Sequence, residues 1–310
     1  KKRRERKQPM PVRTAHGERR GNVKRQSQKS RSLKRQPWYY WASAAVLLIL
    51  TLGPFVWAFI VSVTPEYEMF TNTKNMLPET FVWSNYENLF SMTTSHSIRL
   101  FRGLKNSLTA AAVTLVIGVP LALITAYTLT KMEFPGRKWF KNALLITMVI
   151  PVFATIIPLF RIFVEHDLLD RQFWLALVYV SSFLPMSTWL MCNYFSTIPR
   201  EILEAARVDG CGNLGTFFRI VLPVSGPVIL ACSLIMFLSA WNQFQIPLIL
   251  ASSLETKPAA IVTSEFMTKD SIQYGLTAAG GLIAIIPPAV LALLFRRFLV
   301  SGMMGGAAKG

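Results

Sequence analysis

Six long stretches without a charged residue limit how this 310-residue chain can fold. Each contains at least 19 residues, close to the roughly 20 that an α-helix needs to cross the hydrocarbon of a bilayer. Backbone groups in lipid must find hydrogen-bond partners internally, and a helix satisfies them within one segment. The sequence therefore predicts an all-α, polytopic membrane protein with six transmembrane helices. The charge-free stretches are 36–65, 106–130, 142–160, 172–199, 220–254 and 271–295.

The alternation of apolar and charged stretches also divides the chain into segments. Hydrophobic residues make up 52% of the chain and charged residues only 16%, which is too apolar for an ordinary soluble fold. We expect, in order, a basic disordered tail over 1–37, a transmembrane helix over 38–63, a loop over 64–101, a membrane core over 102–296 and a tail over 297–310. Within the core, helices are expected at about 106–130, 142–163, 173–195, 226–250 and 271–295, with a charged loop over 196–225.

Lys and Arg residues are unevenly divided between the two sides of the predicted membrane. The side that holds both termini carries 25 of them, and the opposite side carries seven. Cytoplasmic loops are enriched in these residues, so both termini and the charged loop are predicted to be cytoplasmic. Without the N-terminal tail the count is ten against seven, which gives the same direction with a smaller margin.

Most of the net charge of +17 comes from the N-terminal tail, which alone contributes +13. The run KKRRERK at its start has no interleaved aromatic residues and no helical periodicity. A solvated tail with incidental attraction to lipid is the main interpretation, and a functional lipid anchor is the second. Nucleic acid is not an expected partner.

No motif for chemistry is found along the chain. The phosphate-binding pattern G-x-x-x-x-G-K-[ST] does not occur, and nothing resembles a nucleophile with its base. His16, His96 and His166 are scattered at no metal-ligand spacing. The chain is therefore not expected to be an enzyme by itself or to hold a metal.

Polar residues interrupt the fifth apolar stretch. The sequence SAWNQFQIP places Trp241, Asn242, Gln243 and Gln245 among apolar neighbours. Amide side chains are costly in lipid unless they face a protein interior or a watery cavity. One interpretation is a translocation path wet enough for a hydroxyl-rich solute, with Trp241 as a stacking surface. The other is interhelical hydrogen bonding that holds the bundle together.

Prolines lie within several of the predicted helices. A proline removes a backbone hydrogen bond and kinks the helix, which suits a bundle that lines a path or changes shape. Transmembrane helices also tolerate proline generally, so both interpretations stay open. The residues are Pro120, Pro151, Pro158, Pro185, Pro247, Pro287 and Pro288.

A compact charged stretch, EAARVDG at 204–210, lies in the charged loop. Acidic residues suit the positive start of a helix, and Gly210 after Asp209 suits a left-handed cap that ends it. Asn213 is placed to cap a second helix, which Pro223 should end. The sequence predicts a helix, a glycine elbow and a second helix at the membrane surface.

Apolar residues of this loop recur at helical spacing, so one face can lie against the bundle. Small Ala205 and Ala206 keep the first helix thin, which would let another surface approach closely. A docking element and an ordinary interfacial helix-turn-helix both fit this periodicity. We expect Ile202, Leu203, Ala206, Phe217, Ile220 and Val221 to face the bundle, and Glu204, Arg207 and Arg219 to face away.

The order of residues in this loop resembles a known signature. E-A-A at 204–206, Gly210 four residues later and I-V-L-P at 220–223 resemble the EAA motif of the membrane subunits of bacterial type I ATP-binding-cassette (ABC) importers. The spacing is fixed over about twenty residues, so the signal is specific. NSL at 106–108, FPGRKWFKNALL, IPLFRIF, STIPREILEAA and WNQF resemble the carbohydrate branch, the maltose-type permeases.

The resemblance implies a multi-pass permease subunit of a bacterial plasma (inner) membrane and a set of partners. A second membrane subunit would complete the path, two copies of a cytoplasmic ATPase would dock on the EAA segment, and an extracytoplasmic solute-binding protein would deliver a sugar or similar polyol. ATP and Mg²⁺ would be used by the ATPase, and this chain would hold no cofactor. Glu204 would meet a basic group of the ATPase, and the loop at about 251–280 would contact the binding protein. The implied coupling residues are Glu204, Ala205, Ala206, Asp209, Gly210, Ile220, Leu222 and Pro223.

Other functions remain open. Importers of the same kind also carry amino acids, peptides or polyamines, so the solute could be of another class. A self-sufficient channel or secondary transporter is a rival, and a subunit that only anchors the ATPase is a weaker one. None of the six charge-free stretches holds the buried ionisable residue that ion-coupled carriers usually need, which disfavours the rival carrier.

Overall fold

A computed structural model of the chain describes residues 37–71, 76–267 and 273–304, with side chains as far as residue 296. These ranges are built from α-helices and one short π-helix, and contain no β-strand. The chain divides into two units, Lys1–Pro54 and Phe55–Gly310, and the division lies inside the first described helix. The tail expected over 1–37 lies outside the described residues except for Pro37.

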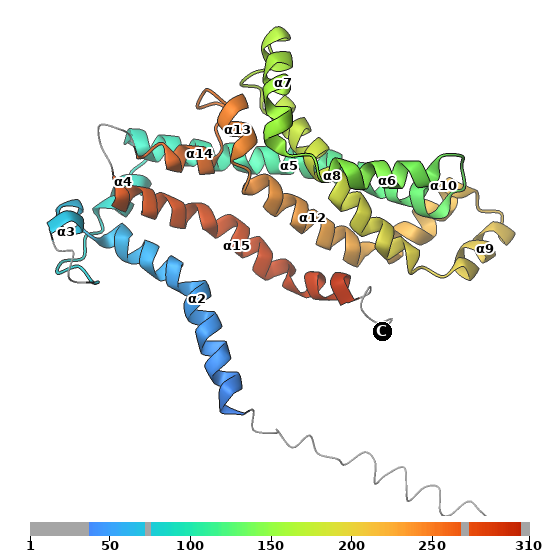
Figure 1. Cartoon of the computed structure of the whole chain (residues 1–310), viewed down its shortest axis with the longest axis horizontal. Helices are drawn as coiled ribbons and strands as arrows, with labels where there is room; N and C mark the ends of the chain where they lie inside the picture. Colours follow the sequence, from blue (N-terminus) through green and yellow to red (C-terminus); the bar gives the residue numbers. More distant parts are fainter. Residues whose placement is uncertain (1–36, 72–75, 268–272, 305–310) are drawn as a thin grey trace, which may run out of the picture. The chain divides into compact units, whose positions relative to one another are not determined.

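The helices follow one another with short connections (Figure 1). They are α2 (Trp38–Val63), α3 (Glu66–Thr71), α4 (Ser84–Phe90), α5 (Ser95–Lys131), α6 (Arg137–Thr147), α7 (Val152–Glu165), α8 (Gln172–Ser196), α9 (Arg200–Val208), α10 (Asn213–Thr216), the π-helix η1 (Phe217–Val221), α11 (Leu222–Val224), α12 (Gly226–Trp241), α13 (Gln245–Leu250), α14 (Ala259–Ser264) and α15 (Tyr274–Met304).

Four described helices are long and apolar enough to cross a membrane: α2, α5, α8 and the Tyr274–Arg296 part of α15. Two further helix pairs, α6 with α7 and Asn213–Val224 with α12, pass the same test only when each bent pair is taken together. The described residues therefore hold four to six candidate spans. The six predicted helices correspond to the upper end of that range.

The single helix expected over 142–163 is wrong, because the chain bends by 94° between α6 and α7. α6 begins earlier, at Arg137, and ends at Thr147. Pro151 precedes α7 with an extended backbone (φ −65°, ψ 135°). A proline disfavours the helical conformation of the residue before it and cannot donate a backbone hydrogen bond, which favours a break at this point.

The continuous helix expected over 226–250 is also wrong, because α12 ends at Trp241 and α13 begins at Gln245. The side-chain Oε1 of Gln243 accepts hydrogen bonds from the backbone N–H groups of Phe244 (3.1 Å) and Gln245 (3.2 Å). Such local bonds compete with the helical ladder. Pro247 also lacks the N–H that would reach the carbonyl of Gln243 in a continuous helix.

Two predicted loops contain helices. The segment expected as a loop over 64–101 holds α3, α4 and the first turns of α5, which the side chain of Thr94 caps by accepting the N–H of Ser97 at 3.2 Å. The tail expected over 297–310 is helical as far as Met304, where α15 ends.

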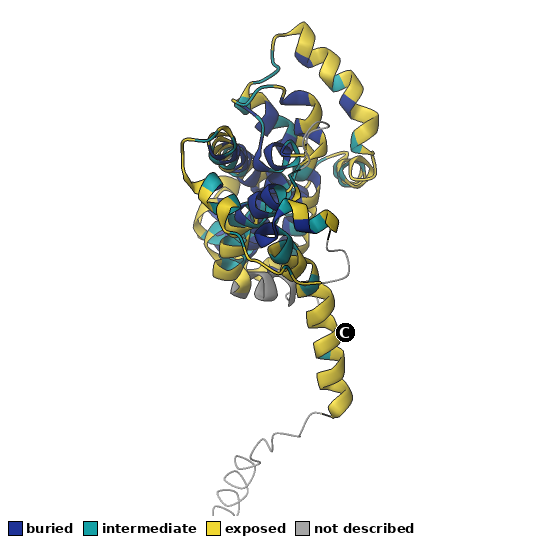
Figure 2. Cartoon of the chain, turned by 90° about the vertical axis from the view of Figure 1, so that its left-hand side faces the viewer, coloured by how far each residue is buried: buried dark blue, intermediate teal, exposed yellow. Residues whose placement is uncertain are grey.

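α5 is the central helix of the second unit and contacts α8, α12 and α14. α12 in turn contacts α8 and α15. A Cβ placed on Gly118 would lie 2.7 Å from the Sδ atom of Met236, so glycine permits the observed approach of α5 to α12. The buried residues lie between these helices (Figure 2).

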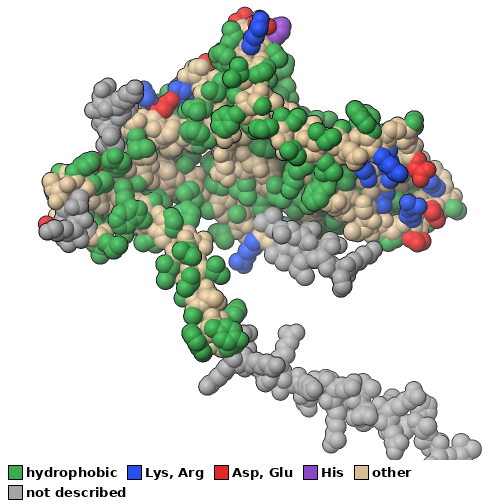
Figure 3. All heavy atoms as spheres, viewed as in Figure 1, with side chains coloured by type: hydrophobic (Ala, Val, Ile, Leu, Met, Phe, Trp, Pro, Cys, Tyr) green, Lys and Arg blue, Asp and Glu red, His purple; other side chains and the backbone are tan. Residues whose placement is uncertain are grey.

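Three buried apolar clusters follow one another along α5. The first, from Val119 to Leu129 on α5, packs α8, η1 and α12 together. The second surrounds Ala110 and Ala111, and the third surrounds Leu100. Outward-facing side chains are apolar as well, and they cover much of the face seen in Figure 3. Apolar surfaces on both sides of the helices suit a protein solvated by lipid.

Candidate functional site

The segment Arg200–Val224, called the elbow segment below, contains the predicted coupling residues. Gly210 follows α9 with φ +80°, the left-handed conformation that favours glycine. The N–H of Cys211 donates to the carbonyl of Ala206 (2.9 Å), and the N–H of Gly210 donates to that of Arg207 (3.1 Å). These two bonds form a Schellman cap, which ends the helix and turns the chain, as the sequence predicts.

The second half of the elbow segment contains a π-helix, η1, which the sequence did not predict. The N–H of Leu222 donates to the carbonyl of Phe217, five residues earlier. Pro223 follows and cannot donate to the carbonyl of Arg219, which favours a wider turn before it. Pro223 does not end the helix at once, because α11 continues to Val224 before the chain bends by 76° into α12.

Three side chains from other helices hold the elbow segment and the residues beside it. The hydroxyl of Tyr127 donates to the carbonyl of Asn213 (3.0 Å), and that of Tyr194 donates to the carbonyl of Val224 (2.8 Å). The Nζ of Lys131 donates to the carbonyl of Ile198 (3.0 Å), just before α9. Sequence reasoning missed these three residues; the available signal was a polar group at the end of a predicted apolar helix.

The predicted coupling residues and the residues expected to face the bundle divide into an outward and an inward group. Ala206 is buried (3% exposed), and Phe217 and Val221 pack in the first apolar cluster. Ile202 was expected to face the bundle but is 46% exposed, so that prediction is wrong. Glu204, Ala205, Asp209, Gly210 and Pro223 are exposed, and Ile220 and Leu222 are half-buried.

Asn213 does not cap the second helix, contrary to expectation. The residue at the cap is Gly212, and no side chain accepts a hydrogen bond there. Asn213 is the first helical residue, and its carbonyl accepts the bond from Tyr127. The predicted cap was one residue out of register, because a glycine before Asn213 can adopt the extended cap conformation equally well.

A polar cleft of about 500 Å³ lies between the start of the elbow segment and the end of α5. Its lining contains Glu204 and three residues that follow one another at the end of α5, Thr130, Lys131 and Met132. The remaining lining residues are Glu133, Arg137, Arg200, Leu203, Arg207 and Asn213. Glu204 is thus exposed beside a cleft in which basic side chains outnumber acidic ones.

The predicted path residues lie at the break between α12 and α13. Trp241 is buried (5% exposed), its ring stacks on Phe237, and its Nε1 donates to the carbonyl of Ala284 on α15 at 3.2 Å. In this conformation its ring has no open face. Asn242 and Gln245 are exposed, and Gln243 binds the backbone of the break. The break thus contains both features: Trp241 forms a hydrogen bond between two helices, and Asn242 and Gln245 leave amide groups exposed.

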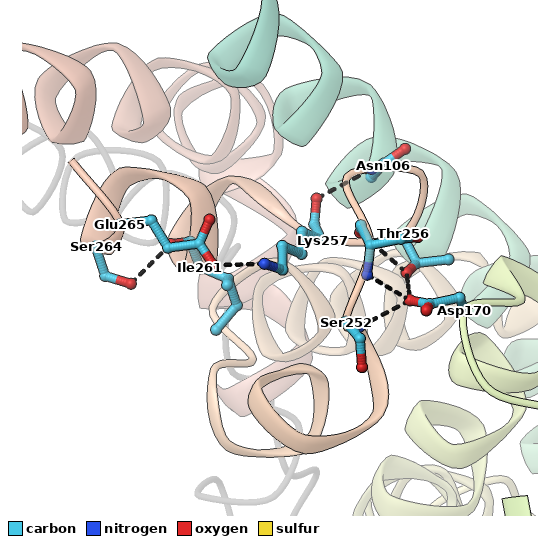
Figure 4. A network of polar contacts seen from close by, with 9 residues as sticks. Asn106, Asp170, Ser252, Thr256, Lys257, Ile261, Ser264 and Glu265 are labelled. Atoms are coloured by element: carbon cyan, nitrogen blue, oxygen red, sulfur yellow. Dashed lines mark hydrogen bonds and ion pairs between the residues drawn. The ribbon is translucent and has the colours of Figure 1, made fainter. Parts of the chain in front are cut away.

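A polar network at the other end of α5 holds the loop 251–265 (Figure 4). The Nδ2 of Asn106 donates to the carbonyls of Leu254 (2.9 Å) and Lys257 (3.0 Å). The hydroxyl of Ser107 accepts the N–H of Ala259 at 2.9 Å. The NSL motif noted in the sequence thus fastens this loop to α5, a role that the sequence did not reveal.

Asp170 joins a third segment to the same loop. Its Oδ1 accepts hydrogen bonds from the N–H groups of Ser252 and Ser253 and from the hydroxyl of Thr256, each at 2.7 Å. Partial burial raises the pKa of the Asp170 carboxyl, but these donated bonds outweigh it and hold the pKa below its ordinary value of 3.8. The carboxylate form is therefore the one that the loop stabilises.

Residues 118–304, more than half of the chain, match the family described as "Binding-protein-dependent transport system inner membrane component". The chain belongs to this family. The match includes the whole elbow segment, the break between α12 and α13 and the loop 251–265. The described helices of this inner-membrane component suit that location, because at least four are able to span a membrane.

Relatives of this inner-membrane component match it over 82–97% of their own length. The trehalose transport system permease SugB of Mycobacterium tuberculosis is 28% identical, covering 87% of this chain and 97% of the relative. The trehalose/maltose permease MalG of Thermococcus litoralis is also 28% identical, covering 86% and 95%. The maltodextrin permease MdxG of Bacillus subtilis is 32% identical, covering 71% and 82%.

Solved structures share the fold. A chain of a bacterial ABC transporter involved in the import of the acidic polysaccharide alginate aligns with a TM-score of 0.69 at 18% identity, covering 93% of this chain and 99% of that one. A chain of the alginate transporter in complex with a periplasmic protein that holds an alginate pentasaccharide aligns with a TM-score of 0.59.

Proposed function

We propose that the chain is the permease subunit of a binding-protein-dependent ABC importer and forms half of a translocation path for a carbohydrate or similar polyol. The observation that carries this proposal is the family match across the elbow segment. The exposure of Glu204 close to the left-handed turn at Gly210 supports it. In this proposal a separate ATPase supplies the energy, and the exposed, acidic surface helix offers that ATPase a contact.

The proposed coupling depends on how the elbow segment is built. Phe217 and Val221, together with the partly buried Leu203 and Leu222, pack one face of the segment against α5, α8 and α12. Glu204, Ala205 and Asp209 stay exposed. A movement of the docked ATPase would then pass into the bundle through buried contacts rather than through a flexible loop. Closure of two ATPase subunits would rock the helices between inward and outward openings.

The partners follow from the same proposal. The complex contains a second membrane subunit, two copies of a cytoplasmic ATPase that bind ATP and Mg²⁺, and an extracytoplasmic solute-binding protein. The elbow segment and both termini lie in the cytoplasm, and the loop 251–265 lies outside, where it meets the binding protein. The chain itself holds no cofactor. Relatives that carry trehalose, maltose and maltodextrin support a sugar as the solute.

A pair of glycines tests the coupling role. Gly210 has φ +80°, whereas Gly212, two residues later, has an extended backbone with φ −69°, and a Cβ would have nothing within 4 Å at either position. Valine at Gly210 must adopt a left-handed conformation that costs about 1–2 kcal/mol for an ordinary L-residue and more for a β-branched one. Gly210→Val should therefore lower uptake of labelled trehalose or maltose about tenfold or more, while Gly212→Val should leave it near the wild-type rate.

Membrane levels of both variants are measured by immunoblot, and co-purification of the ATPase with the tagged chain is measured in parallel. Unimpaired uptake and ATPase binding in Gly210→Val would contradict the coupling role. The rival functions are tested separately. Solute flux through liposomes that contain this chain alone would favour a channel or carrier, and an amino acid or peptide trapped in the co-purified binding protein would replace the sugar assignment.

A further inference from the structure

Two clefts adjoin each other where α5, α6 and α9 meet. The first is the polar cleft beside Glu204 described above. The second, of about 620 Å³, is lined by Glu133, Phe134, Gly136, Arg137, Lys138 and Lys141. Glu133 and Arg137 line both clefts, so the two are direct neighbours, and together they are called the basic trough below.

The charges of the basic trough are unbalanced. Its lining holds six cationic side chains and only two carboxylates, Glu133 and Glu204. None of the six has a carboxylate within ion-pair distance, because the ion pairs of the described residues all lie elsewhere in the chain. Blue side chains, with red ones among them, gather in Figure 3 at the end where α6, α9 and α10 lie in Figure 1. The six are Lys131, Arg137, Lys138, Lys141, Arg200 and Arg207.

Three of these cations are half-buried, namely Lys131, Arg137 and Lys141. Lys131 donates one N–H to the carbonyl of Ile198, and Arg137 donates one N–H to the carbonyl of Met132 at 3.1 Å. An ammonium has three donors and a guanidinium has five, so most donors remain available to a ligand. Removing such cations from water is unfavourable unless an anion compensates them.

The surroundings of the trough are those of a membrane interface. Lys131 is the last residue of α5, a candidate span, so the trough lies at the edge of an apolar helix. Trp139 and Phe140, which follow Lys138 on α6, are 68% and 52% exposed. Aromatic rings beside basic side chains are typical of the level at which lipid headgroups lie.

We propose that the basic trough is a binding site for a phosphate group, with Arg137 and Arg200 as its principal donors, and that the phosphate comes from the headgroup of an anionic phospholipid. Guanidinium groups suit this chemistry because their paired N–H donors match two phosphate oxygens. Arg200 and Glu204 belong to the elbow segment, whereas Arg137 and Lys141 lie outside it, so variants of Arg137 and Lys141 test the lipid site apart from the coupling role.

The test compares lipid retention by the purified full-length chain and its variants, all of which carry the same basic N-terminal tail. Delipidated protein is returned to mixed micelles of phosphatidylglycerol and phosphatidylcholine, and retained lipid is counted by native mass spectrometry. Wild type should retain phosphatidylglycerol in preference to phosphatidylcholine. Arg137→Gln and Arg200→Gln should each weaken that retention about fivefold, the effect expected from one basic side chain near an anionic surface.

Arg161→Gln is the matched control, because Arg161 lies on α7 with 82% of its side chain exposed and is paired with Glu165. It should leave retention unchanged. Lys141→Gln, at the rim of the trough, gives a second variant if an arginine variant fails to fold. Equal retention of the two lipids by wild type, or equal phosphatidylglycerol retention in all the variants, overturns a lipid site.

A second arm separates the possible sources of the phosphate. Inorganic phosphate at millimolar concentration should displace phosphatidylglycerol only weakly if the lipid is the ligand. Thermal stabilisation by inorganic phosphate without lipid, lost in Arg137→Gln but not in Arg161→Gln, would replace the lipid by a free phosphate. Weakened co-purification of the ATPase in Arg137→Gln with unchanged lipid retention would assign the trough to an acidic protein surface and overturn the proposal.

Discussion

The two ends of α5 hold segments of opposite character. At one end, Tyr127 holds the elbow segment and Lys131 holds Ile198 just before it, each by a single hydrogen bond to a backbone carbonyl. Toward the other end, about 20 residues or 30 Å earlier along the helix, Asn106 and Ser107 fasten the loop 251–265. Asp170 adds three further bonds to this loop. Polar bonds thus hold the first segment at a few points, in addition to its buried apolar contacts, and hold the second at many.

Glycine packing shows the same contrast. A Cβ on Gly103 of α5 would lie 3.1 Å from the Cα of Ala259, so α5 and α14 are in backbone contact at the loop end. A Cβ on Gly210, Gly212 or Gly226 would meet nothing within 4 Å. The loop end is thus a fixed platform, and the elbow end presents an open surface. A subunit that receives a solute at one face and a moving ATPase at the other would need this difference.

Removing the Asp170 carboxylate should break the fixed end and give the largest effect. Asp170→Ala leaves the N–H groups of Ser252 and Ser253 and the hydroxyl of Thr256 without their acceptor, which should cost about 2 kcal/mol of local stability. Hydrogen exchange of peptides covering 251–257 should accelerate about thirtyfold, while exchange of the elbow segment should not change.

Asp167→Ala provides the control for this substitution. Asp167 and Asp170 both have left-handed backbones, with φ of 52° and 54°, so alanine is strained equally at both positions. No hydrogen bond from the loop 251–265 to the side chain of Asp167 occurs in the described part of the chain. Equal acceleration of loop exchange in the two variants would mean that backbone strain, and not the carboxylate, accounts for the effect.

Loosening the elbow segment should give a smaller effect, because the tyrosines that hold it each donate a single neutral hydrogen bond. Tyr127→Phe or Tyr194→Phe removes one hydroxyl donor worth about 1 kcal/mol. The natural thiol of Cys211 reports on the elbow directly, since it is half-buried beside Gly210 whereas Cys192 and Cys232 are buried. Maleimide labelling of Cys211 should accelerate about fivefold in each variant.

Tyr86→Phe is the matched control for the tyrosine variants. Its hydroxyl shares a 2.7 Å hydrogen bond with Ser62, away from the elbow segment. Labelling of Cys211 should stay at the wild-type rate in this variant. If Tyr127→Phe and Tyr194→Phe also leave the rate unchanged, the elbow segment is held by its buried apolar residues alone, and the contrast between the two ends weakens.

The sequence was informative where lipid imposes a rule. The stretch expected as a helix over 38–63 forms α2 (Trp38–Val63), and the one expected over 173–195 forms α8 (Gln172–Ser196). In lipid, an uncharged segment of this length can pair all its backbone N–H and C=O groups internally only as a helix. The breaks after Thr147 and Trp241 were missed. Pro151 and Pro247 were visible, but membrane helices tolerate proline, so proline alone does not distinguish a kink from a break.

The candidate site was predictable to the extent that its structure is local. The left-handed turn at Gly210 depends on neighbouring residues, and the sequence predicted it. The hydrogen bonds from Tyr127 and Lys131 join residues 86 and 67 positions apart, and no local pattern encodes which carbonyl a hydroxyl or ammonium will reach. The same reason hid the function of Asn106 and Asp170, whose partners lie 148 and 83 positions away.

Acid should affect the fixed end only at low pH. The pKa of Asp170 lies below 3.8 in the folded protein, so its carboxylate stabilises the loop fully above about pH 5. This contribution is lost as pH falls from 3.8 through the folded pKa, because protonation removes the charged acceptor. Protection of residues 251–257, corrected for the intrinsic pH dependence of exchange, should stay constant from pH 7 to 5 and decline below 3.8. Asp170→Asn keeps an acceptor oxygen but cannot titrate, so its protection should not decline; a matching decline in this variant would place the acid sensitivity on another group.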